Sequence, residues 1–224
     1  MTDTKRKVIH FVRHAEGEHN VAGQVPGGYL REDLEDAILT DLGDRQCQEL
    51  HSKVFHWHVP TAAEEQAAVA KDPHLQQHPI HPSRADLLVV SPLNRALSTA
   101  SQSFEWLQGR IPWVALECVR ETTGLHPCDR RKHIGEHIIG YPHVGFDLIE
   151  HEEDILYPQF KTKREPMDHV VSRGQEFIQW LRGRTEDNII VVTHSSFLQY
   201  FFLGVVGVSE EEFKWFENCE LRSF

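Results

Sequence analysis

Four short apolar runs constrain the fold of this 224-residue chain more than any other feature of its sequence. The runs are Val8–Val12, Leu87–Val90, Trp113–Leu116 and Ile189–Val192. Except for the third, they are almost continuously apolar instead of alternating between apolar and polar residues. That pattern is typical of strands that are covered on both faces, as they are in parallel sheets. The sequence therefore predicts a mostly parallel sheet with a layer of structure on each side.

Helical patterns lie between these runs. Apolar residues recur at helical spacing over Thr40–Val54, Asn94–Leu107 and Met167–Leu181, and Gly183 follows the last of these as a helix stop. Ser209–Glu212 has the pattern of a capping box that opens a short helix. The alternation of strands and helices predicts an α/β fold, a three-layer α/β/α sandwich around a mostly parallel central sheet.

Two stretches interrupt this alternation. Residues 56–85 are rich in His, Ala, Gln and Pro, and we interpret them as an insertion. Residues 126–166 are rich in His, Gly, Pro and charge, have no long helical period, and are too many for a plain loop. We therefore expect a single domain over residues 1–224 with an inserted lid at 126–166.

Charge and cysteine content exclude several classes of protein. The chain has 23 Lys and Arg against 34 Asp and Glu, a net charge of −11, which argues against nucleic acid and anionic membranes as partners. The longest apolar stretch, Phe197–Val208, is too short to span a membrane. The four cysteines form no C-x-x-C pair and the N-terminus is polar, so we expect free thiols and a cytoplasmic location. An anionic substrate would need a local cationic site.

Charged and imidazole side chains follow the predicted strands at the points where these strands end. Arg13 and His14 come directly after the first strand, and His194 comes after the last. Arg95 lies just inside the helix that follows the second strand, and Glu121 follows the third. Ligands of open α/β sheets bind at the carboxyl ends of the strands, so we expect these side chains to converge there.

This set of residue types fits phosphoryl transfer. Guanidinium groups pair with phosphate oxygens, and an imidazole can attack phosphorus when its other ring nitrogen is held by a hydrogen bond. A carboxylic acid can protonate the leaving oxygen and then activate water. The cationic groups would neutralise the developing charge, so the scheme requires no metal. It does require that the His14 ring be reachable from solvent and close to its partners.

Three sequence blocks strengthen this interpretation, because they resemble the signature blocks of the histidine phosphatase (phosphoglycerate mutase-like) superfamily. Their order and spacing match that superfamily from Val8 to about Asn218. Residues 120–131 are similar to the corresponding segment of a fungal and plant group of phosphoglycerate mutase-like proteins. The blocks are Val12-Arg13-His14-Ala15 continuing to Asn20, Ser91-Pro92-Leu93-Asn94-Arg95-Ala96 with Thr99-Ala100, and Val192-Thr193-His194-Ser195.

The resemblance implies roles for individual residues. It implies that His14 is the nucleophile that becomes phosphorylated, and that Glu121 is the general acid and base. It also implies that His194 takes part in catalysis by stabilising the charge on the phosphoryl group. The residues implied as contacts of the substrate phosphate are Arg13, Asn20, Arg95, His194 and, through its backbone N–H at a helix start, Ser195.

Two departures from the superfamily's patterns bear on the reaction. Ala15 stands where many members have glycine, and it is still small enough to let phosphate approach. Residues 122–124 after the acid lack the tyrosine and basic residues of cofactor-dependent mutases. We therefore expect a metal-independent phosphomonoesterase that hydrolyses a small phosphorylated metabolite through a phosphohistidine. The alternatives are a phosphoglycerate-mutase-type phosphotransferase and a non-catalytic module that binds phosphate or phosphopeptides.

Two further groups of side chains allow alternative interpretations. A histidine-rich run in the first insertion could bind metal, but its Pro/Ala/Gln surroundings favour a solvated loop, and we predict neither a metal site nor a cofactor. Basic residues in and near the predicted lid could hold a second anionic group of the substrate or could form a solvated face. The histidines are His56, His58, His74, His78 and His81, and the basic residues are Arg130, Arg131, Lys132, Lys161, Lys163 and Arg164. The oligomeric state stays open.

Overall fold

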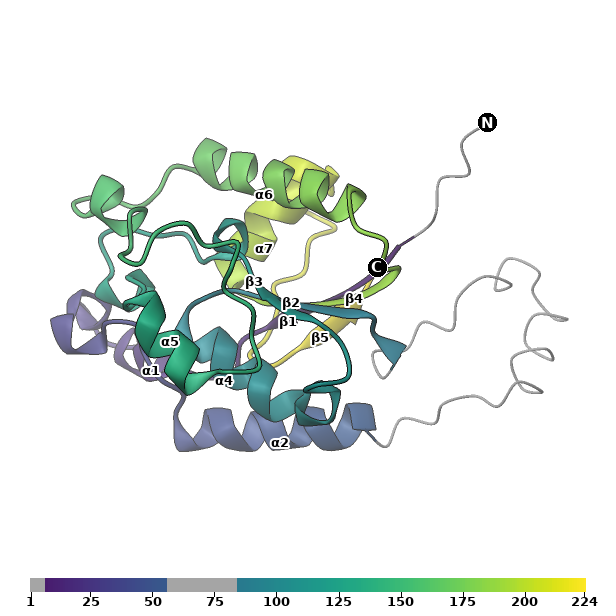
Figure 1. The fold of residues 1–224 in the computed structure, drawn as a ribbon. Coiled ribbons are helices and arrows are strands. Elements are labelled where there is room, and N and C mark those ends of the chain that lie inside the picture. Colours follow the sequence, from purple (N-terminus) through teal and green to yellow (C-terminus); the bar gives the residue numbers. More distant parts are fainter. Residues whose placement is uncertain (1–6, 56–83) are drawn as a thin grey trace, which may run out of the picture.

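The computed structural model describes residues 7–55 and 84–224, and its centre is a five-stranded sheet (Figure 1). The strand order is β3-β2-β4-β1-β5, in which the first four strands pair in parallel and β5 pairs antiparallel to β1. The strands are β1 (Val8–Arg13), β2 (Leu87–Val90), β3 (Trp113–Ala115), β4 (Asn188–Thr193) and β5 (Leu221–Ser223). The mostly parallel sheet predicted from the sequence is confirmed, and β5 is an addition that the sequence patterns do not show.

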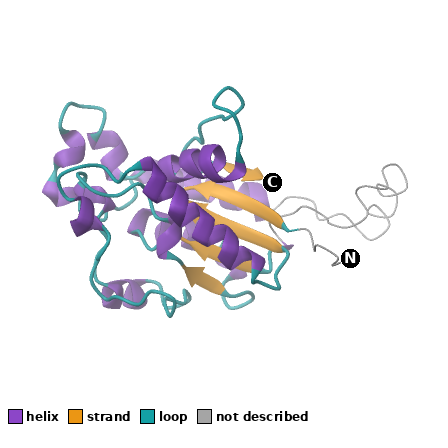
Figure 2. Cartoon of the chain, turned by 90° about the horizontal axis from the view of Figure 1, so that it is seen from above, coloured by secondary structure: helices purple, strands orange, loops and turns teal. Residues whose placement is uncertain are grey.

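Helices cover both faces of the sheet (Figure 2). Val12, Val90 and Val192 belong to one core cluster, with residues of α2 (Asp41–Phe55) and α4 (Asn94–Ser103). Their strand neighbours Phe11, Val89 and Val191 belong to the other, with residues of α6 (Met167–Arg182) and α7 (Ser195–Phe201). Successive strand residues therefore pack into opposite layers, which explains why the strand sequences are almost continuously apolar.

Three of the predicted helices form, and the fourth does not. The predicted helix at Asn94–Leu107 is split, since α4 ends at Ser103 and a 3₁₀ turn covers Glu105–Leu107. The helix predicted to open at Ser209 is wrong. Glu212 N–H donates to Ser209 Oγ at 3.3 Å as a capping box requires, but the chain makes only a turn there. The chain then leads to Phe216, which is buried against Phe202 with 6.1 Å between ring centroids.

Short elements gather beyond the carboxyl ends of the parallel strands. Helices α1 (Glu18–Ala22) and α5 (Ile134–Gly140) lie at that end in Figure 1. A π-helix over Phe202–Val206 prolongs α7. No helix within the described ranges is long and apolar enough to cross a membrane.

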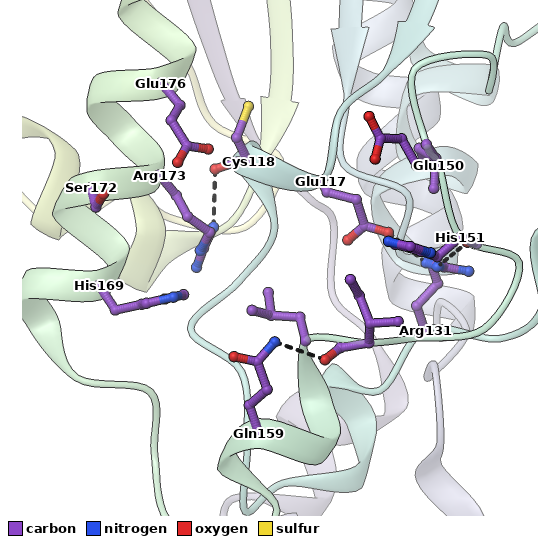
Figure 3. Close-up of a pocket in the computed structure, with 13 residues that line it drawn as sticks. Glu117, Cys118, Arg131, Glu150, His151, Gln159, His169, Ser172, Arg173 and Glu176 are labelled. Atoms are coloured by element: carbon purple, nitrogen blue, oxygen red, sulfur yellow. Dashed lines mark hydrogen bonds and ion pairs between the residues drawn. The ribbon is translucent and has the colours of Figure 1, made fainter.

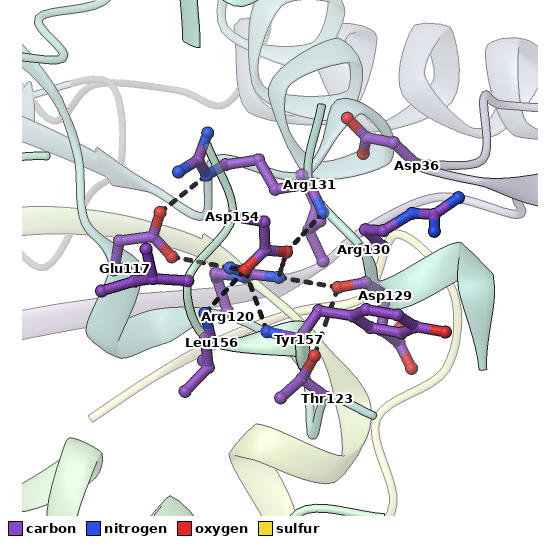
Figure 4. Close-up of polar contacts among 12 residues, drawn as sticks. Asp36, Glu117, Arg120, Thr123, Asp129, Arg130, Arg131, Asp154, Leu156 and Tyr157 are labelled. Atoms are coloured by element: carbon purple, nitrogen blue, oxygen red, sulfur yellow. Dashed lines mark hydrogen bonds and ion pairs between the residues drawn. The ribbon is translucent and has the colours of Figure 1, made fainter. Parts of the chain in front are cut away.

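The segment 126–166 is attached to the body of the protein by several contacts, among them a pairing at the edge of the sheet and a buried ion-pair cluster. Gly145 lies beside the edge strand β3, where its N–H donates to Trp113 O at 2.8 Å and its carbonyl accepts from Ala115 N at 2.9 Å. A buried ion-pair cluster forms the second attachment (Figure 4). That this segment acts as a lid stays a prediction. The first insertion, 56–85, lies almost wholly outside the described residues.

Asp154 is the centre of the second attachment. Its carboxylate accepts hydrogen bonds from both terminal nitrogens of Arg120, at 3.0 and 2.7 Å, and from the backbone N–H of Arg131 at 2.8 Å. Burial alone would raise its pKa, but the Arg120 guanidinium holds the pKa of Asp154 below its ordinary value. Glu117 joins the cluster by accepting from Arg120 and Arg131 at 2.9 and 2.7 Å. The cluster thereby ties the segment to the chain just before Glu121.

Candidate active site

The backbone of His14, directly after β1, is held on both sides by hydrogen bonds. Its N–H donates to Thr193 O at 2.9 Å, which continues the ladder with β4. Its carbonyl accepts from Cys219 N at 3.2 Å and from the Asn218 side chain at 3.1 Å. The position of the imidazole therefore depends on a backbone that is anchored on each side.

Hydrogen bonds fix the protonation of the His14 ring. Its Nδ1 lies 2.7 Å from the carbonyl oxygen of Ala15, which can only accept, so Nδ1 carries the proton. The lone pair is then on Nε2, which accepts from Arg95 Nε at 3.3 Å. Burial lowers the pKa of His14 well below its ordinary value, and the charges of Arg95 and Arg13 lower it further. The ring is therefore a neutral imidazole with its basic nitrogen at Nε2.

The structure brings Arg95 and His194, which were predicted from the sequence, next to this ring. Arg95 lies in contact with it, and its other nitrogens donate to Cys128 O at 2.7 Å and to Asp129 Oδ1 at 2.8 Å. The ring centroid of His194 is 5.0 Å from that of His14. His194 Nε2 lies 2.7 Å from Ser91 Oγ, and burial, with Arg95 next in effect, lowers the pKa of His194 well below its ordinary value.

Several buried polar atoms around His14 lack a hydrogen-bond partner. Within the described residues these include Arg13 Nε, His19 Nδ1 and His194 Nδ1. Arg13 makes a 2.7 Å bond to Phe216 O through Nη1, so its Nε is left over. An unpaired buried polar atom is costly, and such atoms are rare unless a ligand or water completes them. Their gathering here indicates a place for a polar ligand.

Glu121 caps the N-terminus of α7. Its Oε1 accepts from the backbone N–H groups of Thr122 at 2.8 Å and Phe197 at 3.0 Å, and its Oε2 accepts from Ser196 N at 3.4 Å. Burial raises the pKa of this carboxyl, and the nearby Asp129 carboxylate raises it further. Ser195, the first residue of α7, is buried beside these groups. The acid predicted from the sequence therefore lies at the same sheet edge as His194.

Arg173 of α6 fixes the backbone on which Glu121 stands. It donates to the carbonyls of Cys118, Arg120 and Glu121 at 3.0, 3.0 and 3.3 Å. It also lines a cavity of about 240 Å³ between α6 and the segment 126–166 (Figure 3). None of the seven site residues predicted from the sequence lines that cavity.

One requirement of the sequence interpretation is not met. We expected the His14 ring to be reachable from solvent, and the residue is only 1% exposed. Arg95, which is fully buried, donates to the ring nitrogen that would have to attack. A phosphate group can reach Nε2 only if this hydrogen bond breaks.

The sequence predicts that Asn20 contacts the substrate phosphate, but in the structure its side chain makes a local hydrogen bond. Its side-chain oxygen accepts from Gly17 N at 3.0 Å and caps the start of α1, so its contact with phosphate stays a prediction.

The sequence interpretation missed three residues of the site. Thr99 Oγ1 joins the two blocks, since it accepts from Ala15 N at 2.9 Å and donates to Arg95 O at 2.7 Å. The other two are His19 and Asp129. His19 lies in the first sequence block, so its position in that block could have indicated a place in the site. No sequence pattern indicates such a place for Asp129.

Residues 7–55 and 84–224 contain no group of three or more His, Cys, Asp or Glu side chains that could hold a metal ion. The histidine-rich run considered for metal binding lies outside the described residues.

A comparison with protein families agrees with the geometry. The model of the histidine phosphatase superfamily (branch 1) matches residues 60–224. The chain belongs to this superfamily. It is also similar to two proteins of Arabidopsis thaliana, a phosphoglycerate mutase-like protein and a phosphoglycerate mutase-like protein 2. The identities are 33% and 34%, and each comparison covers 97% of this chain and 83% or 73% of the relative.

Solved structures with the same fold include phosphatases. A putative alpha-ribazole-5′-P phosphatase from Escherichia coli matches with a TM-score of 0.59 and 19% identity, over 97% of this chain and 89% of the other. A phosphoserine phosphatase from Entamoeba histolytica matches with a TM-score of 0.54 and 16% identity, over the same shares. At these identities the comparison establishes the fold alone.

Proposed function

We propose that this protein hydrolyses phosphate monoesters of small molecules through a phosphohistidine on His14, without a metal. The observation that carries the proposal is the state of the His14 ring, which is neutral, has its proton fixed on Nδ1 and lies among Arg13, Arg95 and His194. Phosphatases of the same fold support hydrolysis as the reaction type. A cytoplasmic location stays a prediction from the sequence.

In the first step, Arg95 moves from His14 Nε2 to the phosphate oxygens. The Nε2 lone pair then forms a bond to phosphorus while the bond from phosphorus to the ester oxygen breaks. Arg13, Arg95 and His194 hold the charge of the transferring group, as preorganised donors do in phosphoryl transfer. Glu121 gives its proton to the leaving oxygen, which departs as a neutral alcohol.

In the second step, the carboxylate of Glu121 takes a proton from water. The resulting hydroxide attacks phosphorus, and the bond between Nε2 and phosphorus breaks. Inorganic phosphate leaves, His14 recovers its lone pair, and Glu121 is again protonated. The raised pKa of Glu121 suits both halves of this cycle, because the acid form is restored at a pH where an exposed carboxyl would stay ionised.

Product analysis tests the proposal. The protein is incubated with a panel of phosphate monoesters that includes 3-phosphoglycerate, and inorganic phosphate and isomerised esters are both quantified. We expect inorganic phosphate. An isomerised phosphoester without phosphate release would identify a phosphotransferase instead. Absence of turnover, with phosphate binding retained, would identify a binding module.

The pH dependence of kcat/KM should be bell-shaped, with its maximum on the acid side of neutrality. His14 must be neutral to attack, so activity falls as the pH drops through its pKa, which lies well below the ordinary histidine value. Glu121 must be protonated, so activity falls as the pH rises through its pKa, which lies above the ordinary value. A pH series with wild type and Glu121→Gln measures this, and the variant should lose the alkaline limb. A maximum above pH 8 would contradict these assignments.

Replacing Asp129 with asparagine should move the alkaline limb to lower pH by about one unit, a typical effect of one nearby charge. The negative charge of Asp129 raises the pKa of Glu121, so its removal lets Glu121 ionise earlier. The matched control is Glu35→Gln, which removes the same charge from a carboxylate bound to Arg130 at 2.7 Å. The control should leave the limb in place, and an equal shift in both variants would speak against a specific effect of Asp129.

A further inference from the structure

Four aromatic rings form a row that begins at His14. The ring centroids of His14 and His19 are 5.4 Å apart, and those of His19 and Tyr29 are 6.3 Å apart. Tyr29 stacks on His126 with 5.0 Å between centroids and 16° between ring planes. The row therefore joins the candidate nucleophile, α1, the 3₁₀ turn at Gly28–Leu30 and the loop that follows Glu121. Its outer pair, Tyr29 and His126, is half-buried.

The backbone is shaped to keep the outer pair stacked. A Cβ at Gly23 would lie 2.1 Å from the Tyr29 ring, so only glycine allows the ring its place. Gly124 has φ +79°, and a Cβ there would lie 2.3 Å from the Phe160 carbonyl. The turn at Gly124 also brings His126 N–H to within 2.6 Å of Gly124 O. The same loop thus carries the proposed acid at its start and the stacked His126 at its end.

The arginines on this side of the site are occupied by protein groups. Arg130 binds both oxygens of Glu35. Arg131 binds Glu117 and four backbone carbonyls. Arg164 binds Asp129 at 2.7 Å and the carbonyls of Gly124 and Thr122. A second anionic group of a substrate could bind these arginines only if their contacts with the protein broke.

The outer rings themselves offer an uncharged surface. Burial lowers the pKa of His126, and the charge of Arg164 lowers it further, so this imidazole is neutral near pH 7. Tyr29 packs with Leu34, Ala37 and Cys128 in a small apolar cluster. Flat rings interact favourably with other flat rings beyond simple burial of area.

We propose that the leaving-group side of this site selects phosphate monoesters of alcohols that carry a flat, uncharged aromatic ring, with Tyr29 and His126 as the residues that determine this specificity. The inference rests on the proposed phosphatase function. It names a substrate class that differs from doubly anionic esters such as 3-phosphoglycerate.

Two esters that differ only in the flatness of one ring test the proposal. Benzyl phosphate and cyclohexylmethyl phosphate have the same carbon skeleton and leaving alcohols of similar acidity. We expect kcat/KM to favour the benzyl ester by about 5- to 10-fold in the wild type, the upper range of measured aromatic pairs. Tyr29→Leu and His126→Leu should each reduce this ratio to about 2 or less.

The control variant is Phe55→Leu, which removes a ring that stacks on His51 of α2 at 5.6 Å and 19°. It should keep the wild-type ratio. If Tyr29→Leu does not fold, His126→Leu decides the outcome. Hydrolysis of both esters at equal efficiency by the wild type, an unchanged ratio in the variants, or a preference for 3-phosphoglycerate over benzyl phosphate would each overturn the inference while leaving the phosphatase proposal intact. Failure to hydrolyse any ester would instead remove the proposed function.

Discussion

Replacing His14 with alanine is expected to reduce turnover of phosphate monoesters by a factor on the order of 10⁴ to 10⁶, the usual cost of deleting a nucleophile. The imidazole supplies the lone pair that attacks the phosphorus of the ester in the first step of the proposed scheme. The backbone anchors of His14 do not involve its side chain, so the variant should fold.

Trapping the intermediate separates this role from a structural one. Wild type is mixed with a ³²P-labelled monoester and quenched rapidly in alkali, in which a phosphohistidine survives, and protein-bound label is counted. His14→Ala should hold no label. The control is His151→Ala, which removes an exposed imidazole whose backbone carbonyl alone contacts Arg131. Label on the His14→Ala protein, or turnover near that of wild type, would refute the assignment.

Replacing Asp154 with alanine is expected to lower the free energy of unfolding by about 3–5 kcal/mol, as is typical when one partner of a buried ion pair is removed. Arg120 is fully buried and donates twice to this carboxylate. The backbone N–H groups of Arg131, Leu156 and Tyr157 lose their acceptor in the same variant. Urea unfolding followed by circular dichroism measures the change.

Glu153→Ala is the matched control for this prediction, because it removes a neighbouring carboxylate that is 81% exposed. Exposed charges of this kind contribute little, so its unfolding midpoint should stay within the error of the wild type. Equal midpoints for Asp154→Ala and wild type would show that the cluster in Figure 4 does not hold the segment 126–166 in place.

The parallel strands could be predicted because their pattern has one physical cause. Strands such as β2 and β4 are buried on both faces, which demands apolar residues at every position. The antiparallel strand β5 could not be predicted, because it is short, lies at the sheet edge and has the mixed sequence Leu-Arg-Ser.

The capping-box pattern at Ser209 predicted a helix that does not form. Its local hydrogen bonds form, but a helix also needs an apolar face to bury, and Glu210 and Glu211 are exposed.

The sequence predicts the residues of the candidate site that directly follow the ends of the strands. The convergence of His14, His194, Arg95 and Glu121 follows from four parallel strands that end at one edge. Asp129 was not predictable, because its contact with Arg95 depends on the path of a long irregular segment. The burial of His14 could not be predicted from the sequence either, because no sequence pattern indicates that Arg95 covers its reactive nitrogen.

The anchoring of the His14 backbone divides the site into a stationary half and an adaptable half. Because β4 on one side and Asn218 and Cys219 on the other hold the first half, adjustments that admit a substrate fall to Arg95 and to the loop from Leu125 to Asp129. Amide hydrogen exchange should accordingly be slow at the end of β1 and faster in that loop, and added inorganic phosphate should retard exchange mainly in the loop. The chemistry would then keep a constant geometry at the attacking atom while related proteins vary the alcohol they accept by changing the loop alone.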